Sequence, residues 1–269
     1  LAAVVVTIIT FDILQNHFIN GQVNLVVMAL LVLFFESSRR NEEFKASLFL
    51  SMAIAIKLVP MIFVGYLIFR KKIKSIVYVA LITPSLMLLP AIVTGKKIIA
   101  YYQSYLHGFI LDRVGIAGGL NTSHIEYSLQ YFLRKILQHK HESFLIMLFA
   151  AFMVCIPIAW QEIEAWKKKD TENNIWIFAL YLIAIPLISP MSEKHHLVYL
   201  IPILWLSSIA LLHRKTQYFS TKVTLLCMAF VFLTIGKVFQ QNELYFIFLC
   251  LSYGLAIFMS RDDERMRKG

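Results

Sequence analysis

Two adjacent histidines, His195 and His196, form the part of this sequence that is best suited to chemistry. They follow Glu193 and Lys194 and lie between two strongly apolar segments. A neutral imidazole can accept or donate a proton near pH 7, and an imidazolium can pair with phosphate. Polar side chains at the edge of a bilayer are costly unless they face water or a substrate, so we expect a functional site here. The alternative is a helix start that carries interfacial polar residues.

A single lysine, Lys57, lies deep within another apolar run, in the stretch AIAIKLVP. It is too far from either end of the run to reach the membrane surface easily. A cation at such a depth pairs with an anion or lines a polar cavity, and Pro60 disturbs the helix about one turn later. The residues favour a buried cation near a lipid phosphate. A structural ion pair with an unidentified carboxylate is the alternative.

Three side-chain amides could contact a ligand. Gln22 and Asn24 follow Gly21 at the start of an apolar helix, where helix capping alone would explain them. Asn121 belongs to an Asn-Thr-Ser sequence that also matches a glycosylation sequon. From the residues alone, capping or solvent exposure remains open for all three.

The composition indicates an integral membrane protein. The chain has 269 residues, of which 59% are hydrophobic, whereas soluble domains are about 45–50% apolar. The formal net charge of +10 could indicate nucleic acid, but the basic residues cluster in short loops between apolar runs, as the positive-inside rule predicts for a membrane protein. We therefore expect no nucleic-acid partner. The three cysteines lie within apolar runs and are expected to be buried, and no histidine or cysteine spacing predicts a metal site.

The apolar runs predict an all-α polytopic membrane protein with about eight to nine transmembrane helices in a single domain, 1–269. The candidate spans are 1–14 (partial), 22–35, 46–69, 75–94, 143–165, 174–191, 197–212, 222–238 and 244–260. The opening run, LAAVVVTIIT, is typical of the end of a transmembrane helix, so we expect that an N-terminal part is missing.

The distribution of lysine and arginine predicts the orientation. Basic clusters at 70–74, 167–169, 214–222 and 261–268 mark cytoplasmic loops. Their parity puts 95–142 and 192–196 on the outer face. The loop 36–45 has mixed charge, and simple alternation puts it outside, with 46–69 as a single span. The alternative is a cytoplasmic loop 36–45, with 46–69 broken near Lys57–Pro60 so that it enters the membrane and returns. We expect the single span.

The long connection 95–142 contains a predicted amphipathic helix that lies in the membrane interface. Ser123 and Glu126 match a capping box at its start. One face carries Ile125, Leu129, Phe132 and Ile136, and the other carries Gln130, Arg134, Lys135 and Gln138. Tyr101, Tyr102 and Tyr105 are expected at headgroup level.

Four motifs occur in order along the chain: GQVNLVV at 21–27, AIKLVP at 55–60 followed by RKK, NTS at 121–123, and SPMSEKHH at 189–196. Together they resemble glycosyltransferase family 87, polytopic mannosyltransferases of bacterial envelopes with the GT-C architecture. The resemblance implies inverting transfer of a hexose, usually mannose, from a polyprenyl-phosphate carrier to an envelope glycolipid or glycan. It also implies an active site that faces outward from the bacterial inner membrane.

The resemblance further implies residue roles. Lys57 would hold the donor phosphate, and His195 or His196 would line the active site against the donor or the acceptor. Donor or acceptor would be oriented by Gln22, Asn24 and Asn121. The catalytic base would be an acidic residue of the first extracytoplasmic loop, which we expect upstream of Leu1. No cofactor is expected, a divalent metal is optional, and Glu193 and Lys194 depart from the family's usual pattern before the two histidines.

Two other functions remain open. A transporter or flippase of a lipid-linked or anionic solute would also bury a lysine and break a helix near proline, although no internal repeat is visible. An inactive, truncated glycosyltransferase would lack the catalytic base.

Overall fold

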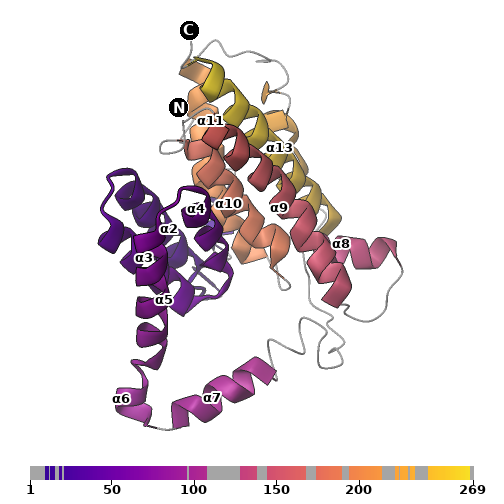
Figure 1. Ribbon diagram of the computed structural model, residues 1–269. Coiled ribbons are helices and arrows are strands. Elements are labelled where there is room, and N and C mark those ends of the chain that lie inside the picture. Colours follow the sequence, from indigo (N-terminus) through magenta and orange to yellow (C-terminus); the bar gives the residue numbers. More distant parts are fainter. Residues whose placement is uncertain are drawn as a thin grey trace.

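The computed structural model describes residues 10–11, 13–15, 18–19, 21–95, 97–107, 128–137, 144–167, 174–189, 194–213, 222–223, 225–229, 231–233 and 242–266. All regular secondary structure in these ranges is helical, and they contain no strand (Figure 1). The predicted all-α class is therefore confirmed.

Most of the described helices overlap the predicted apolar runs, apart from the broken segment 46–69, a helix at 97–105 that no run predicted and the start of the amphipathic helix. Their bounds are α2 Asn24–Arg39, α3 Glu43–Ile56, η1 Val59–Ile62, α4 Phe63–Phe69, α5 Ile73–Leu88, α6 Ala91–Thr94, α7 Lys97–Tyr105, α8 Leu129–Ile136, α9 Phe144–Lys167, α10 Ile175–Ile188, η3 Lys194–Leu200, α11 Ile201–His213 and α13 Asn242–Met266. Within the described ranges, the stretches Ile73–Thr94 and Leu145–Lys167 are long and apolar enough to cross a membrane. The total of eight to nine spans stays a prediction.

Helix α10 forms the centre of the core. It is apolar all round, and its side chains from Trp176 to Leu187 are buried, as expected for a helix without a polar face. Helices α9 and α13 pack against it, together with η3 and α4 (Figure 1). Aromatic rings connect it to the first half of the chain, because Phe178 stacks on Phe35 of α2 with ring centroids 4.3 Å apart.

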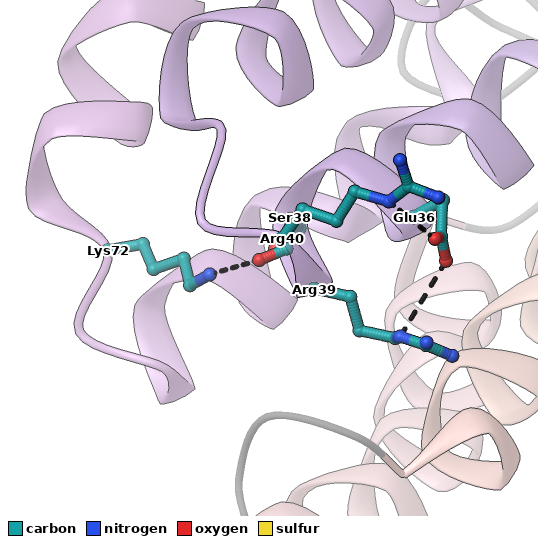
Figure 2. A network of polar contacts seen from close by, with 5 residues as sticks. All are labelled: Glu36, Ser38, Arg39, Arg40 and Lys72. Carbon is teal, nitrogen blue, oxygen red and sulfur yellow. Dashed lines mark hydrogen bonds and ion pairs between the residues drawn. The ribbon is translucent and has the colours of Figure 1, made fainter.

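The turns that follow α2 and precede α5 lie side by side. Lys72 donates from Nζ to the carbonyl oxygen of Ser38, at 2.6 Å, and to Oδ1 of Asn41, at 3.1 Å. Figure 2 shows Lys72 reaching Ser38 across the two turns. The Ser47 hydroxyl of α3 is also 3.1 Å from the carbonyl oxygen of Ser75 in α5. Helices α3 and α5 therefore begin at the same end of the structure.

The prediction of a single span over 46–69 is wrong. Helix α3 leads away from the paired turns and ends at Ile56, and the chain then returns to them through η1 and α4. With a rise of about 1.5 Å per residue in an α-helix and about 2.0 Å in a 3-10 helix, α3 is about 21 Å long, and the return through η1 and α4 is about 19 Å. The two arms match, so the segment is a re-entrant hairpin with Lys57 at its tip. Loop 36–45 consequently shares a side with the basic turn 70–74.

The mixed charges of loop 36–45, which gave no sign for orientation, pair locally. Glu36 accepts from Arg40 at 2.8 Å and lies 3.6 Å from Arg39 (Figure 2). These are exposed pairs between neighbouring turns of one helix, which contribute little to stability. Because the acidic and basic side chains balance, the loop has no net positive charge from which the positive-inside rule could assign its side of the membrane.

The amphipathic helix begins later than predicted. Helix α8 starts at Leu129, and the Ser128 side chain caps it by accepting from the Tyr131 amide at 3.2 Å. Ser128 has an extended backbone, with ψ 156°, so α8 begins directly after it. Gln130 was expected on the polar face but is buried, and Phe132 stacks on Phe246 of α13. The predicted cap at Ser123 and Glu126 lies outside the described residues, and the outer-face position stays a prediction.

Helix α5 packs against α3, and its far part extends beyond the rest of the bundle and leads to α6 and α7 (Figure 1). Several of its large apolar side chains are exposed, including Ile73, Leu81 and Leu88. The Tyr102 hydroxyl donates to the Met87 carbonyl oxygen at 2.6 Å and ties α7 to the last turn of α5. The three cysteines were expected to be buried, but their side chains are exposed.

Candidate functional site at the tip of the re-entrant hairpin

Helix α3 ends at the hairpin tip, and Lys57 is its C-terminal capping residue. Its amide still donates to the Ala53 carbonyl oxygen at 3.0 Å, but its backbone is extended, with φ −152° and ψ 128°. Pro60 explains the break, because a proline ring clashes with the carbonyl four residues earlier in a helix, here that of Ile56. The same proline is tolerated in the first turn of η1. The sequence thus stops α3 one residue before Lys57.

Three segments far apart in sequence meet at the Lys57 ammonium. Nζ donates to Oδ1 of Asn24, the first residue of α2, at 2.9 Å, and it also contacts Nε2 of His196 in η3. The Tyr199 hydroxyl donates to the same Asn24 oxygen at 3.3 Å. Asn24 and Tyr199 are completely buried, and His196 is 3% exposed. We call these four residues the Lys57 cluster.

The contacts orient the lysine through uncharged acceptors. An ammonium has only donors, so Nε2 of His196 accepts from it only when that ring nitrogen carries no proton. The amide of Asn24 is likewise neutral. Neither contact cancels the charge of Lys57, and an anion that reaches a cation in an apolar setting is held more strongly than it would be in water. The cluster is therefore suited to a phosphate group.

Helix type explains why His196 and Tyr199 face the same point. Both lie in η3, a 3-10 helix with three residues per turn, in which side chains three positions apart are aligned. Sequence reasoning placed a helix from 197 and stopped the polar stretch at His196, so Tyr199 was missed. Its spacing of three from the second histidine was the available signal.

The structure brings together three of the predicted site residues, namely Asn24, Lys57 and His196. Gln22 is half-buried ahead of α2 and is not part of the contacts that define the cluster. The His195 backbone lies in η3, but its side chain is outside the described part, as is all of Asn121. Over the same described ranges, no group of three His, Cys, Asp or Glu side chains could hold a metal ion.

A second polar contact fixes the opposite end of the hairpin. Arg70, which follows α4, donates from Nη1 to Oε1 of Glu162 in α9 at 2.6 Å, and the two side chains are 2% and 1% exposed. The guanidinium carbon lies 3.5 Å from the centre of the Tyr66 ring. Arg70 was predicted only as one charge of a cytoplasmic loop, and no spacing pointed to Glu162 as its partner. The pair joins the hairpin to α9.

Comparison with known proteins identifies the family. The sequence profile described as Glycosyltransferase family 87 matches residues 1–190. The chain belongs to glycosyltransferase family 87. The match includes the segments that carry Asn24 and Lys57 and ends ahead of His196. The predicted resemblance is therefore confirmed.

Two curated relatives are similar to this chain, and both are named polyprenol-phosphate-mannose-dependent alpha-(1-2)-phosphatidylinositol mannoside mannosyltransferase. The protein of Mycolicibacterium smegmatis is 24% identical over 223 residues, which cover 81% of this chain and 49% of the relative. The protein of Mycobacterium tuberculosis is 24% identical over 189 residues, which cover 70% and 42%. The chain thus spans about half the length of these relatives. No solved structure matches it.

Proposed function

We propose that this protein is an integral-membrane glycosyltransferase. It transfers a hexose, mannose in particular, from a polyprenyl-phosphate carrier to an envelope glycolipid or glycan. Membership of family 87 supports the reaction class, and the names of the two relatives support the donor. The observation that carries the proposal is the Lys57 ammonium, which Asn24 and His196 hold at the break of a re-entrant hairpin.

The chemistry of this donor suits the Lys57 cluster. In an inverting transfer, a base removes the proton of an acceptor hydroxyl, and the hydroxyl oxygen attacks the anomeric carbon. The bond between that carbon and the phosphate oxygen breaks, and the polyprenyl phosphate leaves with the negative charge. A fixed cation beside the leaving oxygen stabilises that charge as it develops. Lys57 has this role, and His196 lines the same site.

The remaining parts of the proposal follow from the sequence. His195, Gln22 and Asn121 contact the donor or the acceptor, and neither a cofactor nor a metal is required. The cluster faces outward from the bacterial inner membrane, within one transmembrane domain. The hairpin supports this side, because Lys57 is at the end away from the turn 70–72, and the positive-inside rule assigns that basic turn to the cytoplasm.

Transfer assays on the full-length protein test the proposal. The protein is reconstituted in liposomes with polyprenyl-phosphate-mannose and an envelope lipid extract as acceptor. Lys57→Ala is expected to lower transfer at least about 100-fold, as loss of one stabilising group does in other enzymes. Lys45→Ala is the matched control, because Lys45 is exposed and its ammonium lies 3.1 Å from the carboxylate of Glu42, which precedes α3. Its transfer should stay at the wild-type level. Undiminished transfer by Lys57→Ala would overturn the role of Lys57.

A transporter or flippase of a lipid-linked anion is the second candidate, and the re-entrant hairpin is the observation that favours it, since broken helices line transport sites. Movement of polyprenyl-phosphate-mannose across the liposome membrane without sugar transfer would support this candidate. Sugar transfer without such movement would support the enzyme.

A further inference from the structure

We infer that Tyr199 and Asn24 are positioning residues that hold the Lys57 ammonium at the place where it meets the donor phosphate. The inference rests on the proposed function and changes the role of Asn24, which acts on the lysine instead of on the sugar. It also adds Tyr199, a residue to which neither the sequence motifs nor the family match gives a role.

The Asn24 oxygen is fixed from two sides. Lys57 donates to Oδ1 at 2.9 Å and Tyr199 donates to the same atom at 3.3 Å. The amide has one accepting end and one donating end, and only the accepting end can face an ammonium. The Tyr199 ring is completely buried, so its hydroxyl is a stationary donor. Its hydrogen bond links η3 to the start of α2 and determines where Oδ1 lies.

Lys57 needs such a partner because its side chain is long and mobile. A lysine side chain loses considerable rotamer entropy when it is held in one geometry. The hairpin break fixes the Lys57 backbone, but Nζ is four carbons beyond Cα. Two acceptors at known places, Oδ1 of Asn24 and Nε2 of His196, limit the positions that Nζ can occupy. The ordering of the lysine is thus completed before the donor arrives.

An amide at position 24 orients the lysine without neutralising it. Aspartate has nearly the same shape and would accept the same two hydrogen bonds, but its charge would form an ion pair with the ammonium. That carboxylate would compete with the donor phosphate for the same cation. The structural role and the electrostatic role of residue 24 can therefore be separated by a single substitution.

The test measures the dissociation constant of a short-chain polyprenyl phosphate for the full-length protein, and donor and acceptor KM in the transfer assay. Tyr199→Phe is expected to weaken phosphate binding and raise donor KM by about five- to tenfold, the usual effect of one hydrogen bond. Acceptor KM should not change. Tyr253→Phe is the matched control, because the Tyr253 hydroxyl also donates a buried hydrogen bond, at 2.7 Å to the Val154 carbonyl oxygen, between α13 and α9.

Two further variants complete the test. Asn24→Asp should weaken phosphate binding more than Asn24→Ala does, and Tyr199→Phe should add nothing in the Asn24→Ala background. Wild-type affinity in Asn24→Asp would overturn the inference, because a merely structural role tolerates aspartate. Equal effects of Tyr199→Phe and Tyr253→Phe would overturn it as well.

The two proposals fail in different ways. A wild-type protein that binds polyprenyl phosphate but transfers no sugar would refute the proposed function, and the binding comparison would still decide the roles of Tyr199 and Asn24. A wild-type protein that does not bind polyprenyl phosphate would overturn both.

Discussion

Nζ of Lys57 lies 2.9 Å from Oδ1 of Asn24, although the two residues are 33 positions apart in the chain. The contact joins the tip of the re-entrant hairpin to the first residue of α2, at the end away from the turns that Lys72 connects. Hydrogen bonds thus hold the hairpin to its neighbours at both ends. The cation at the tip has a defined position because of that arrangement.

The first prediction concerns His196. His196→Ala should lower sugar transfer about 100-fold or more, since it removes both the imidazole and an acceptor of the Lys57 ammonium. His196→Gln should retain more activity than His196→Ala, because its amide oxygen can still accept from Lys57. Transfer assays at saturating acceptor measure both. The control is His107→Ala, at an exposed position beyond α7. Equal activity of His196→Gln and His196→Ala would contradict a role for the contact between His196 and Lys57.

The second prediction concerns the buried ion pair between Arg70 and Glu162. Glu162→Gln leaves the buried guanidinium without its counter-charge and should destabilise the protein by about 3–5 kcal/mol. Arg40→Ala breaks only an exposed pair with Glu36 and should cost less than about 1 kcal/mol. Thermal unfolding of the detergent-solubilised protein compares the two. Similar stability of both variants would mean that the buried pair does not hold the hairpin against α9.

The third prediction concerns topology. In a background without the three native cysteines, a cysteine at Asn41 and one at Lys71 should react with a membrane-impermeant maleimide from the same side of the membrane, because the two turns are adjacent. A cysteine at Tyr101, beyond the far end of α5, should react from the opposite side. Labelling of positions 41 and 71 from opposite sides would restore the single span and refute the hairpin.

The fourth prediction concerns the break itself. Pro60→Ala removes the clash with the Ile56 carbonyl and allows α3 to extend past Lys57. The lysine would then turn away from Asn24 and His196, so transfer should fall about 10- to 100-fold, as it does when a reacting group is misplaced by an ångström or so. Thermal stability should change little, because a proline is replaced by a strong helix former. Kinetic and unfolding measurements on the same sample separate the two effects.

Local patterns were sufficient to predict the helices and most of the residues of the Lys57 cluster. Helices such as α9 and α10 follow from apolar runs whose ends are marked by charge, and Lys57 was a candidate because a cation is costly within such a run. Asn24 and His196 were candidates through their motifs. That the three would meet could not be predicted, because their contact depends on how α2, the hairpin and η3 pack together.

The errors arose where packing at long range overrode a local signal. Hydropathy gives the length of an apolar run but does not show whether the chain turns back within it. Two short helices that return to the side where they began therefore look like one span. The hydrogen bonds of Lys72 to Ser38 and Asn41 reveal the return. Gln130, expected on the polar face of the amphipathic helix, is buried. Tyr199 joins the cluster through a 3-10 turn that apolar periodicity does not signal.

Because little of the surface of the stretch Ile73–Thr94 is buried, we expect the protein to be sensitive to the thickness of its membrane. The stretch Ile73–Thr94 has 22 residues, about 33 Å of helix against a hydrocarbon core of about 30 Å. Few protein side chains cover it, so hydrophobic mismatch is relieved by tilting of the helix. The Ser47–Ser75 contact joins the base of α5 to α3, the arm of the hairpin that ends at Lys57. Transfer rates in nanodiscs of increasing acyl length would therefore test whether the bilayer itself adjusts the position of Lys57.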